Sequence, residues 1–125
     1  MNVLLVALGG ALGAVGRYGL VLLLRPHSPG WPLGTLIVNL IGCLAIGVIG
    51  GAGQHVLSPR ADSRVWAFAV IGILGGFTTF SSFGLETVEL VQEGRMASAV
   101  AYIALSNVVG LGLAWAGYVL GVKFA

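Results

Sequence analysis

One stretch of the chain, Gly75 to Phe83, carries side chains that could do chemistry within an otherwise apolar region. It reads Gly-Gly-Phe-Thr-Thr-Phe-Ser-Ser-Phe, which brings together four hydroxyl groups, a glycine pair and three phenylalanine rings. A helix that only anchored a protein would contain Leu, Ile and Val instead, because an unsatisfied polar group in hydrocarbon costs several kcal/mol. We therefore interpret this hydroxyl-rich stretch as a candidate site.

The chemistry that this stretch suits is contact with an anion. Other polar side chains should lie at the depth of the apolar segments, namely Arg17, Asn39, Tyr102, Ser106 and Asn107. Apart from Arg17 these are neutral donors, which suit an anion that must shed water and still leave, whereas a fixed positive charge would hold it too tightly for conduction. Phe80 and Phe83 would share one helix face and offer the positive edges of their rings. The alternative is that both are ordinary packing or lipid-facing aromatics.

Several other chemistries are excluded by what the apolar segments lack. No Asp, Glu, Lys or His lies near the middle of any segment, and Glu86 and Glu89 come late in the third. Proton-coupled pumps and intramembrane hydrolases are expected to bury carboxylates or bases among their helices. The hydroxyl groups of Ser81 and Ser82 have no base at comparable depth to activate them, and no cluster has metal-ligand spacing. We expect no enzyme activity.

The elements that must position these residues are membrane helices. Of the 125 residues, 58% are hydrophobic and 8% are charged, whereas about 25% of the residues in soluble domains are charged. Four apolar segments each approach the ~20 residues that a bilayer requires; they cover residues 3–24, 33–53, 65–90 and 97–122. The short connections hold most of the charges and all four prolines. We predict an all-α membrane protein, a single domain of four transmembrane helices.

Glycine spacing predicts how these helices pack. Pairs of glycines four residues apart occur in three of the segments: Gly9 with Gly13, Gly47 with Gly51, and Gly117 with Gly121. Small residues at this spacing let membrane helices approach closely. We therefore expect these pairs to mark helix contacts.

The third segment is longer than one straight helix across the bilayer needs to be. Its 26 residues would extend roughly 39 Å at ~1.5 Å per residue, against a hydrocarbon core of roughly 30 Å. The helix must therefore tilt or be broken. A Gly-Gly pair followed by Thr-Thr and Ser-Ser tolerates a break, since these residues weaken a helix and can satisfy the freed backbone groups. We predict a broken third helix, interrupted near Gly75 to Ser82.

The Lys and Arg residues hardly favour either orientation of the chain in the membrane. With four spans, the N-terminus, the second connection and the C-terminus share one side, which has Arg60, Arg64 and Lys123. The other side has Arg25 and Arg95. Because the bias of Lys and Arg sets orientation, a difference of one predicts that both orientations are inserted. Such a dual-topology chain can form an antiparallel homodimer whose two-fold axis lies in the membrane plane.

Three motifs link the chain to a known family. They are Gly-Gly-Ala-Leu-Gly-Ala-Val-Gly-Arg-Tyr at 9–18, Gly-Thr-Leu-Ile-Val-Asn-Leu-Ile-Gly at 34–42, and the hydroxyl-rich stretch at 75–83. The motifs fall in three successive segments, and the likeness covers nearly the whole chain. The chain resembles the Fluc (CrcB) family of small fluoride channels.

The resemblance implies a passive channel that exports fluoride from the cytoplasm and so protects against its toxicity. Family members are antiparallel homodimers with two fluoride pores, and their third helix is broken at the dimer centre. The pore residues implied here are Asn39, Thr79, Phe80, Ser82, Phe83, Tyr102 and Ser106. The resemblance also implies that the backbone carbonyls of Gly75 and Thr78 hold a structural Na⁺ between the subunits, and that Arg17 lies near the aqueous vestibule. The expected location is the bacterial cytoplasmic membrane.

Some of these assignments have alternatives. A cation bound by four freed carbonyls, two from each subunit, would satisfy a helix break in a dry interior, but Ser and Thr side chains could also repair a glycine kink. The alternative for Arg17 is a side chain that extends to the membrane interface. Gly110 lies where the family can have a further polar residue, and Ser82 replaces the more frequent Thr. The far end of the polar track therefore stays open.

Two other functions compete with a channel. A small dual-topology multidrug-type exporter also has four short helices, but it needs a buried carboxylate, and the first segment has none. A scaffold without transport activity would not need the hydroxyl-rich stretch. The sequence favours the fluoride channel.

Overall fold

The structure, a computed structural model, describes residues 2–56 and 63–124, and every element in these two ranges is a helix. The elements in chain order are α1 (Asn2–Leu24), η1 (Arg25–His27), α2 (Leu33–Val56), α3 (Arg64–Trp66), η2 (Ala67–Leu74), α4 (Gly75–Phe77), α5 (Phe80–Gln92), α6 (Met96–Ala104), η3 (Leu105–Val109) and α7 (Gly110–Phe124). The longer two η elements, η2 and η3, are π-helical. Arg60, which enters the topology count, lies outside the described residues.

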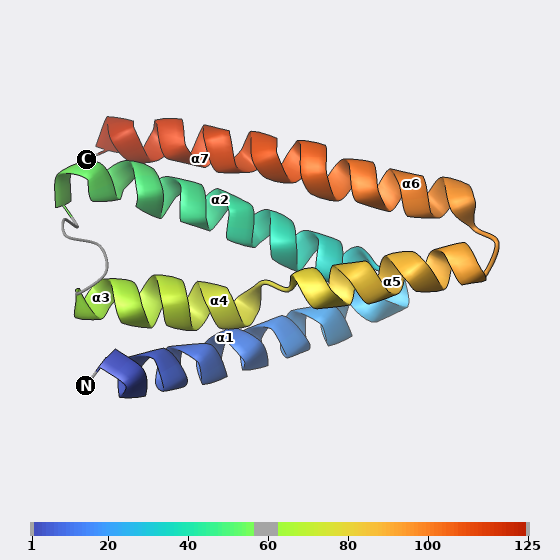
Figure 1. Cartoon of the computed structure of the whole chain (residues 1–125), viewed down its shortest axis with the longest axis horizontal. Coiled ribbons are helices and arrows are strands. Elements are labelled where there is room, and N and C mark those ends of the chain that lie inside the picture. The colour runs from blue at the N-terminus through green and yellow to red at the C-terminus, as the bar shows by residue number, and fades with distance from the viewer. Residues whose placement is uncertain (1, 57–62, 125) are drawn as a thin grey trace.

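Within the described ranges, four helical stretches are long and apolar enough to cross a membrane. They are Asn2–His27, Leu33–Gly53, Arg64–Gln92 and Met96–Phe124. The predicted all-helical architecture with four spans is confirmed. Successive spans run in opposite directions, and both chain ends lie at the same end of the molecule (Figure 1).

The spans pack in two closely contacting pairs. α2 lies along α7, and α1 lies along η2 and α4. The glycine pairs are buried at these contacts: a Cβ atom on Gly9 would lie 3.0 Å from the Cα of Gly72, and one on Gly51 would lie 2.9 Å from the backbone nitrogen of Val122. Any side chain larger than hydrogen would push the helices apart there. The predicted close packing at the glycine pairs is confirmed.

The third span is not one continuous helix. α4 ends at Phe77 and α5 begins at Phe80. Between them, Thr78 (φ −81°, ψ 157°) and Thr79 (φ −153°, ψ 118°) are extended, and Figure 1 shows them as the thin link between α4 and α5. Two residues of the hydroxyl-rich stretch therefore carry backbone groups without the usual helical partners.

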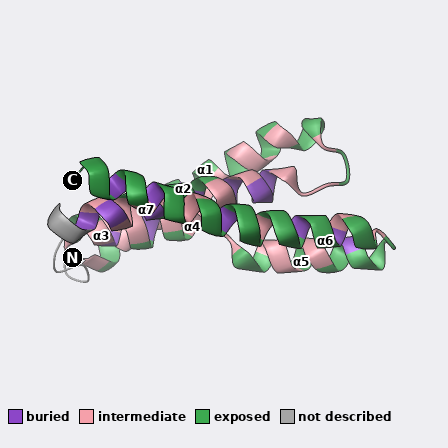
Figure 2. Cartoon of the chain, turned by 90° about the horizontal axis from the view of Figure 1, so that it is seen from above, coloured by how far each residue is buried: buried purple, intermediate pink, exposed green. Residues whose placement is uncertain are grey.

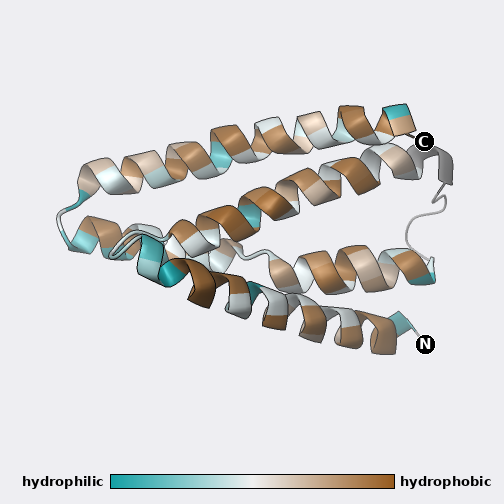
Figure 3. Cartoon of the chain, turned by 180° about the vertical axis from the view of Figure 1, so that it is seen from behind, coloured by the Kyte–Doolittle hydropathy of each residue, from teal (hydrophilic) through white to brown (hydrophobic). Residues whose placement is uncertain are grey.

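A single chain has little interior of its own. One cluster of buried residues, Leu36, Leu90, Ala99 and Tyr102, lies where α2, α5 and α6 meet. Elsewhere much of the helix surface is exposed (Figure 2), and apolar residues cover it along the whole length of the molecule (Figure 3). Such a surface suits lipid or a second protein chain.

Candidate functional site

The side chain of Asn39 bridges α2 to the extended link in the third span. Its Nδ2 donates to the carbonyl of Thr79 at 2.9 Å, and its Oδ1 accepts from the Thr79 N–H at 2.8 Å. One amide therefore satisfies both backbone groups of a residue that lies outside a helix. This contact fixes the link against α2.

The two threonines of the link end one helix and begin the next. The N–H and the hydroxyl of Thr78 donate to the carbonyl of Leu74 at 3.0 and 2.9 Å, which closes α4. Thr79 is the N-cap of α5: its Oγ1 accepts from the Ser82 N–H at 3.2 Å, and it lies 3.1 Å from the Ser82 hydroxyl. An N-cap threonine is among the favoured residues for starting a helix. The hydroxyl groups that looked unusual by sequence thus have local partners.

A cavity of about 440 Å³ opens beside this link. Its walls come from α2, η2, α4, the link, α5 and η3, and they include Asn39, Cys43, Thr79, Phe80, Phe83 and Ser106. The Ser106 hydroxyl is buried and has no hydrogen-bond partner among the described residues. Asn107, the next residue, also lines the cavity and donates to the carbonyl of Ile103 at 2.8 Å. No lining residue carries a formal charge, so the cavity offers neutral polar groups and two phenylalanine rings.

A row of aromatic rings leads away from this cavity. The Phe80 and Phe83 rings have centroids 5.5 Å apart, the Phe83 and Tyr102 centroids are 5.1 Å apart, and Tyr102 meets Trp31 edge-on at 5.7 Å. Phe83 is half-buried, whereas Phe80 is 82% exposed in the single chain. The Phe80 ring is therefore free to contact a bound ion or another chain.

At the end of the row, Glu86 makes a contact that the sequence analysis missed. The Tyr102 hydroxyl donates to its Oε2 at 2.6 Å, and the Thr35 hydroxyl donates to its Oε1 at 2.6 Å. Tyr102 is fully buried and Thr35 nearly so. Charge-assisted bonds of this length are strong. Glu86 lies three residues after Phe83, on the same face of α5. This spacing is the sequence signal that could have indicated a contact between Glu86 and the neighbours of Phe83.

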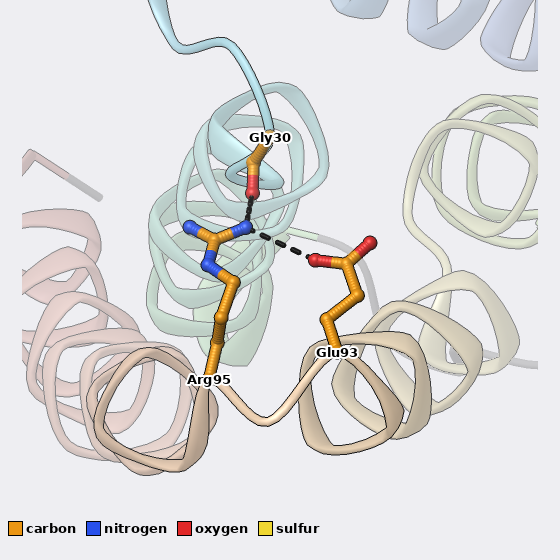
Figure 4. A network of polar contacts seen from close by, with 3 residues as sticks. All are labelled: Gly30, Glu93 and Arg95. Atoms are coloured by element: carbon orange, nitrogen blue, oxygen red, sulfur yellow. Dashed lines mark hydrogen bonds and ion pairs between the residues drawn. The ribbon is translucent and has the colours of Figure 1, made fainter.

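A second cavity, of about 570 Å³, lies beyond Glu86 and is charged. Arg25, Glu86, Glu89 and Glu93 line it together with the loop between η1 and α2. Arg95 binds this loop: its Nη1 donates to the carbonyl of Gly30 and pairs with Glu93 at 3.3 Å (Figure 4). Phe83, which lines the neutral cavity, contacts Tyr102, and Tyr102 donates to Glu86, which lines the charged cavity.

The predicted site residues fall into three groups. Asn39, Thr79, Phe80, Phe83 and Ser106 line the neutral cavity, as do Gly75 and Thr78. Ser82 and Tyr102 are not among its lining residues, but they contact Thr79 and Phe83 respectively. Arg17 lines neither cavity; its Nη1 lies 3.4 Å from the carbonyl of Thr78. The assignment of Arg17 to a vestibule stays a prediction.

Fold and site together define a class: a multi-pass integral membrane protein of four short spans, with a neutral, donor-lined cavity where its third span is interrupted. Residues 4–118 match the family model described as CrcB-like protein, Camphor Resistance (CrcB), and the chain therefore belongs to the CrcB family.

Close relatives carry a common name. A protein of Methylobacillus flagellatus named "Fluoride-specific ion channel FluC" is 50% identical over 121 residues, which cover 95% of this chain and 93% of that protein. Proteins of the same name from Paracoccus denitrificans and Rhodospirillum centenum are each 45% identical, over 93% and 94% of this chain and over 90% and 93% of their own lengths. The similarity spans nearly the full length of each chain.

Proposed function

We propose that this chain forms a passive, fluoride-selective channel that exports fluoride from the cytoplasm. The observation that carries the proposal is the 50% identity, over 95% of the chain, to a protein named as a fluoride-specific ion channel. The neutral cavity supports it, because fluoride needs donors to replace its water but no charge to trap it. A multidrug-type exporter is not favoured, since the relatives of this chain are named as fluoride-specific ion channels.

In this proposal the residues of the site contribute different groups to binding the anion. Ser106 offers a buried hydroxyl that has no partner among the described residues, and Asn39 has one N–H beyond the one it donates to Thr79. Phe80 and Phe83 present ring edges, which carry partial positive charge. Thr79 and Ser82 order the start of α5, and Tyr102 continues the track toward the charged cavity. The path proposed for fluoride runs from one cavity to the other.

The proposed working unit is an antiparallel homodimer with one pore on each side of its two-fold axis. A single chain leaves Phe80, which lines the neutral cavity, 82% exposed. A second copy in the opposite orientation would cover this ring. In this arrangement the third helix of each chain is broken at the dimer centre, and the molecule lies in the cytoplasmic membrane.

The link residues also fit a structural Na⁺ at that centre. In a continuous helix the Gly75 carbonyl would accept from the Thr79 N–H, but this N–H donates to Asn39, and the Ser82 N–H that would serve the Thr78 carbonyl donates to Thr79 Oγ1. Two carbonyls per chain therefore lack their helical donors. Freed carbonyls in broken membrane helices are ligands that Na⁺ prefers. The long 3.4 Å contact from Arg17 leaves the Thr78 oxygen a second lone pair.

The direct test is fluoride efflux from liposomes that contain the purified protein. Valinomycin provides a path for K⁺, and an electrode follows the released anion. We expect rapid release of fluoride and no comparable release from vesicles loaded with chloride. Efflux no faster than from protein-free liposomes would reject the channel, and efflux that depends on an imposed proton gradient would point to an exporter.

A further inference from the structure

The Thr79 peptide depends on another helix for its hydrogen bonding. Its dihedral angles, φ −153° and ψ 118°, are those of a β-strand. Asn39 binds it with two reciprocal bonds, of 2.9 and 2.8 Å, to the N–H and the carbonyl of the same residue. This is the pattern by which one strand binds its antiparallel neighbour. Here a side chain takes the place of the neighbouring strand.

The other donor groups of the two link residues are satisfied within the third span itself. The Thr78 N–H and hydroxyl both return to Leu74, and the Thr79 hydroxyl caps Ser82. The Thr79 N–H has Asn39 Oδ1 as its acceptor, and that oxygen belongs to α2. An unpaired N–H at this depth would be costly, because no water replaces the lost partner. The extended link therefore requires the amide.

We infer that Asn39 is a positioning residue, whose amide clamps the Thr79 peptide in its extended conformation. Thr79 is the N-cap of α5, so its peptide sets the direction in which α5 leaves the link. Phe80 is the first residue of α5, and its ring is exposed toward the cavity. By holding Thr79, Asn39 fixes the Phe80 ring edge relative to the donors of α2 and η3. The fluoride efflux that tests this inference rests on the proposed function, whereas the structural measurement does not.

The chemistry of the clamp predicts different effects for two substitutions. Asn39→Leu removes donor and acceptor together. Asn39→Asp keeps an acceptor for the Thr79 N–H, but its carboxylate has no proton to donate to the Thr79 carbonyl and repels it. Once protonated, the acid donates one O–H to that carbonyl and accepts the N–H, which restores both bonds. Acidification should therefore rescue Asn39→Asp and leave Asn39→Leu unchanged.

The ionisable groups around the clamp are common to both variants and the wild type. They are Arg17 of α1, which contacts the Thr78 carbonyl, Cys43 of α2, which lines the same cavity, and Glu86 of α5, which is bound by Thr35 and Tyr102. Comparing each variant with the wild type at the same pH removes their contribution. It also removes the leak of undissociated acid through the lipid.

The test measures hydrogen–deuterium exchange at the link and fluoride efflux in parallel, near neutral pH and in mildly acidic medium. We expect the peptide that contains Thr79 to exchange about tenfold faster than wild type in Asn39→Leu at both pH values, because the Thr79 N–H loses its buried acceptor. In Asn39→Asp it should exchange faster only near neutral pH, where the carboxylate repels the Thr79 carbonyl and so moves the link away from its acceptor. The efflux of Asn39→Asp relative to wild type should rise at least several-fold on acidification.

Two results would overturn the clamp: wild-type exchange protection at the link in Asn39→Leu, or an Asn39→Asp variant whose protection stays lost in acid. If Asn39→Leu does not fold, the Asn39→Asp variant alone tests the clamp, because its exchange at the link near neutral pH is compared with its exchange in acid. Absence of fluoride efflux from the wild type would reject the proposed function, while the exchange measurement would still test the clamp.

Discussion

At the scale of single residues, the cavity is built from groups that can hold an anion without charge. Its walls carry amide and hydroxyl groups and two phenylalanine rings, and the guanidinium of Arg17, which does not line the cavity, lies 3.4 Å from the carbonyl of Thr78. The carboxylate of Glu86 lies to one side, with both oxygens already bound by hydroxyl groups. An anion in the cavity would therefore meet donors first.

Phe80→Ile should reduce fluoride efflux sharply while the dimer persists. The substitution keeps an apolar side chain but removes the positive ring edge. Because Phe80 is 82% exposed in the single chain, the change leaves no void in the chain's own core. Efflux is measured with the fluoride electrode and assembly by size-exclusion chromatography. Phe124→Ile is the control, since Phe124 is 87% exposed at the end of α7. Unchanged efflux from Phe80→Ile would remove the role of the ring.

Tyr102→Phe should lower the stability of the folded protein by about 1.5–3 kcal/mol, the usual value for a hydrogen bond to a charged group. The Glu86 carboxylate loses a 2.6 Å donor and keeps the one from Thr35. Thermal unfolding in detergent measures the effect. Tyr18→Phe is the matched control, because Tyr18 is 68% exposed on α1. Equal stability of the two variants would mean that the Tyr102 hydroxyl does not support Glu86.

Sequence reasoning named the polar and aromatic residues that line the neutral cavity, but not the role of Glu86. Neutral donors at membrane depth were visible from their type and their position within apolar segments. Glu86 comes late in its segment, and spacing along one helix does not reveal which helix packs against it. Its partners Thr35 and Tyr102 lie 51 and 16 residues away. Such contacts depend on tertiary packing.

At the scale of elements, glycine faces hold the spans together and the link interrupts one of them. α2 and α7 pack so closely that the backbone of each occupies the space that a side chain on the other's glycines would need. The same holds between α1 and η2. The four spans and the glycine contacts could be predicted, because hydropathy and spacing are properties of the chain. The π-helical segments η2 and η3 could not, since no residue type in them indicates the i→i+5 hydrogen bonds of a π-helix.

Two neighbouring glycines allow a matched test of this packing. Gly51→Ala should destabilise the protein by about 1–3 kcal/mol, the cost of overpacking, because its Cβ would press on the backbone of Tyr118 and Val122. Gly50→Ala should be neutral or slightly stabilising, since nothing lies within 4 Å of its Cβ position and alanine favours helix. Thermal unfolding midpoints provide the comparison. Equal shifts for the two variants would contradict the predicted contact.

At the scale of the whole molecule, the described Lys and Arg residues other than Arg17 of α1 lie at the two ends. Arg64 and Lys123 lie at the end that holds both termini, and Arg25 and Arg95 lie at the other. Arg95 is engaged with Gly30 and Glu93, but its charge still counts for insertion. So small a bias does not fix an orientation. The proposed antiparallel dimer needs chains of both orientations.

A reporter active only in the cytoplasm and a second one active only outside it, each fused to the C-terminus, should both give a signal. Adding two or three lysines to the loop between η1 and α2 should force one orientation and abolish fluoride efflux. An oppositely biased copy, expressed together with it, should restore efflux. Signal from only one reporter on the unmodified chain would contradict dual topology.

The central claim, passive and selective conduction of fluoride, is tested most directly by the reversal potential of the current in a planar bilayer. With fluoride at different concentrations on the two sides and chloride at equal concentrations, the account predicts a current that reverses at the equilibrium potential of fluoride, with no proton gradient present. A current that reverses at the equilibrium potential of chloride, or no current through a correctly assembled protein, would contradict it.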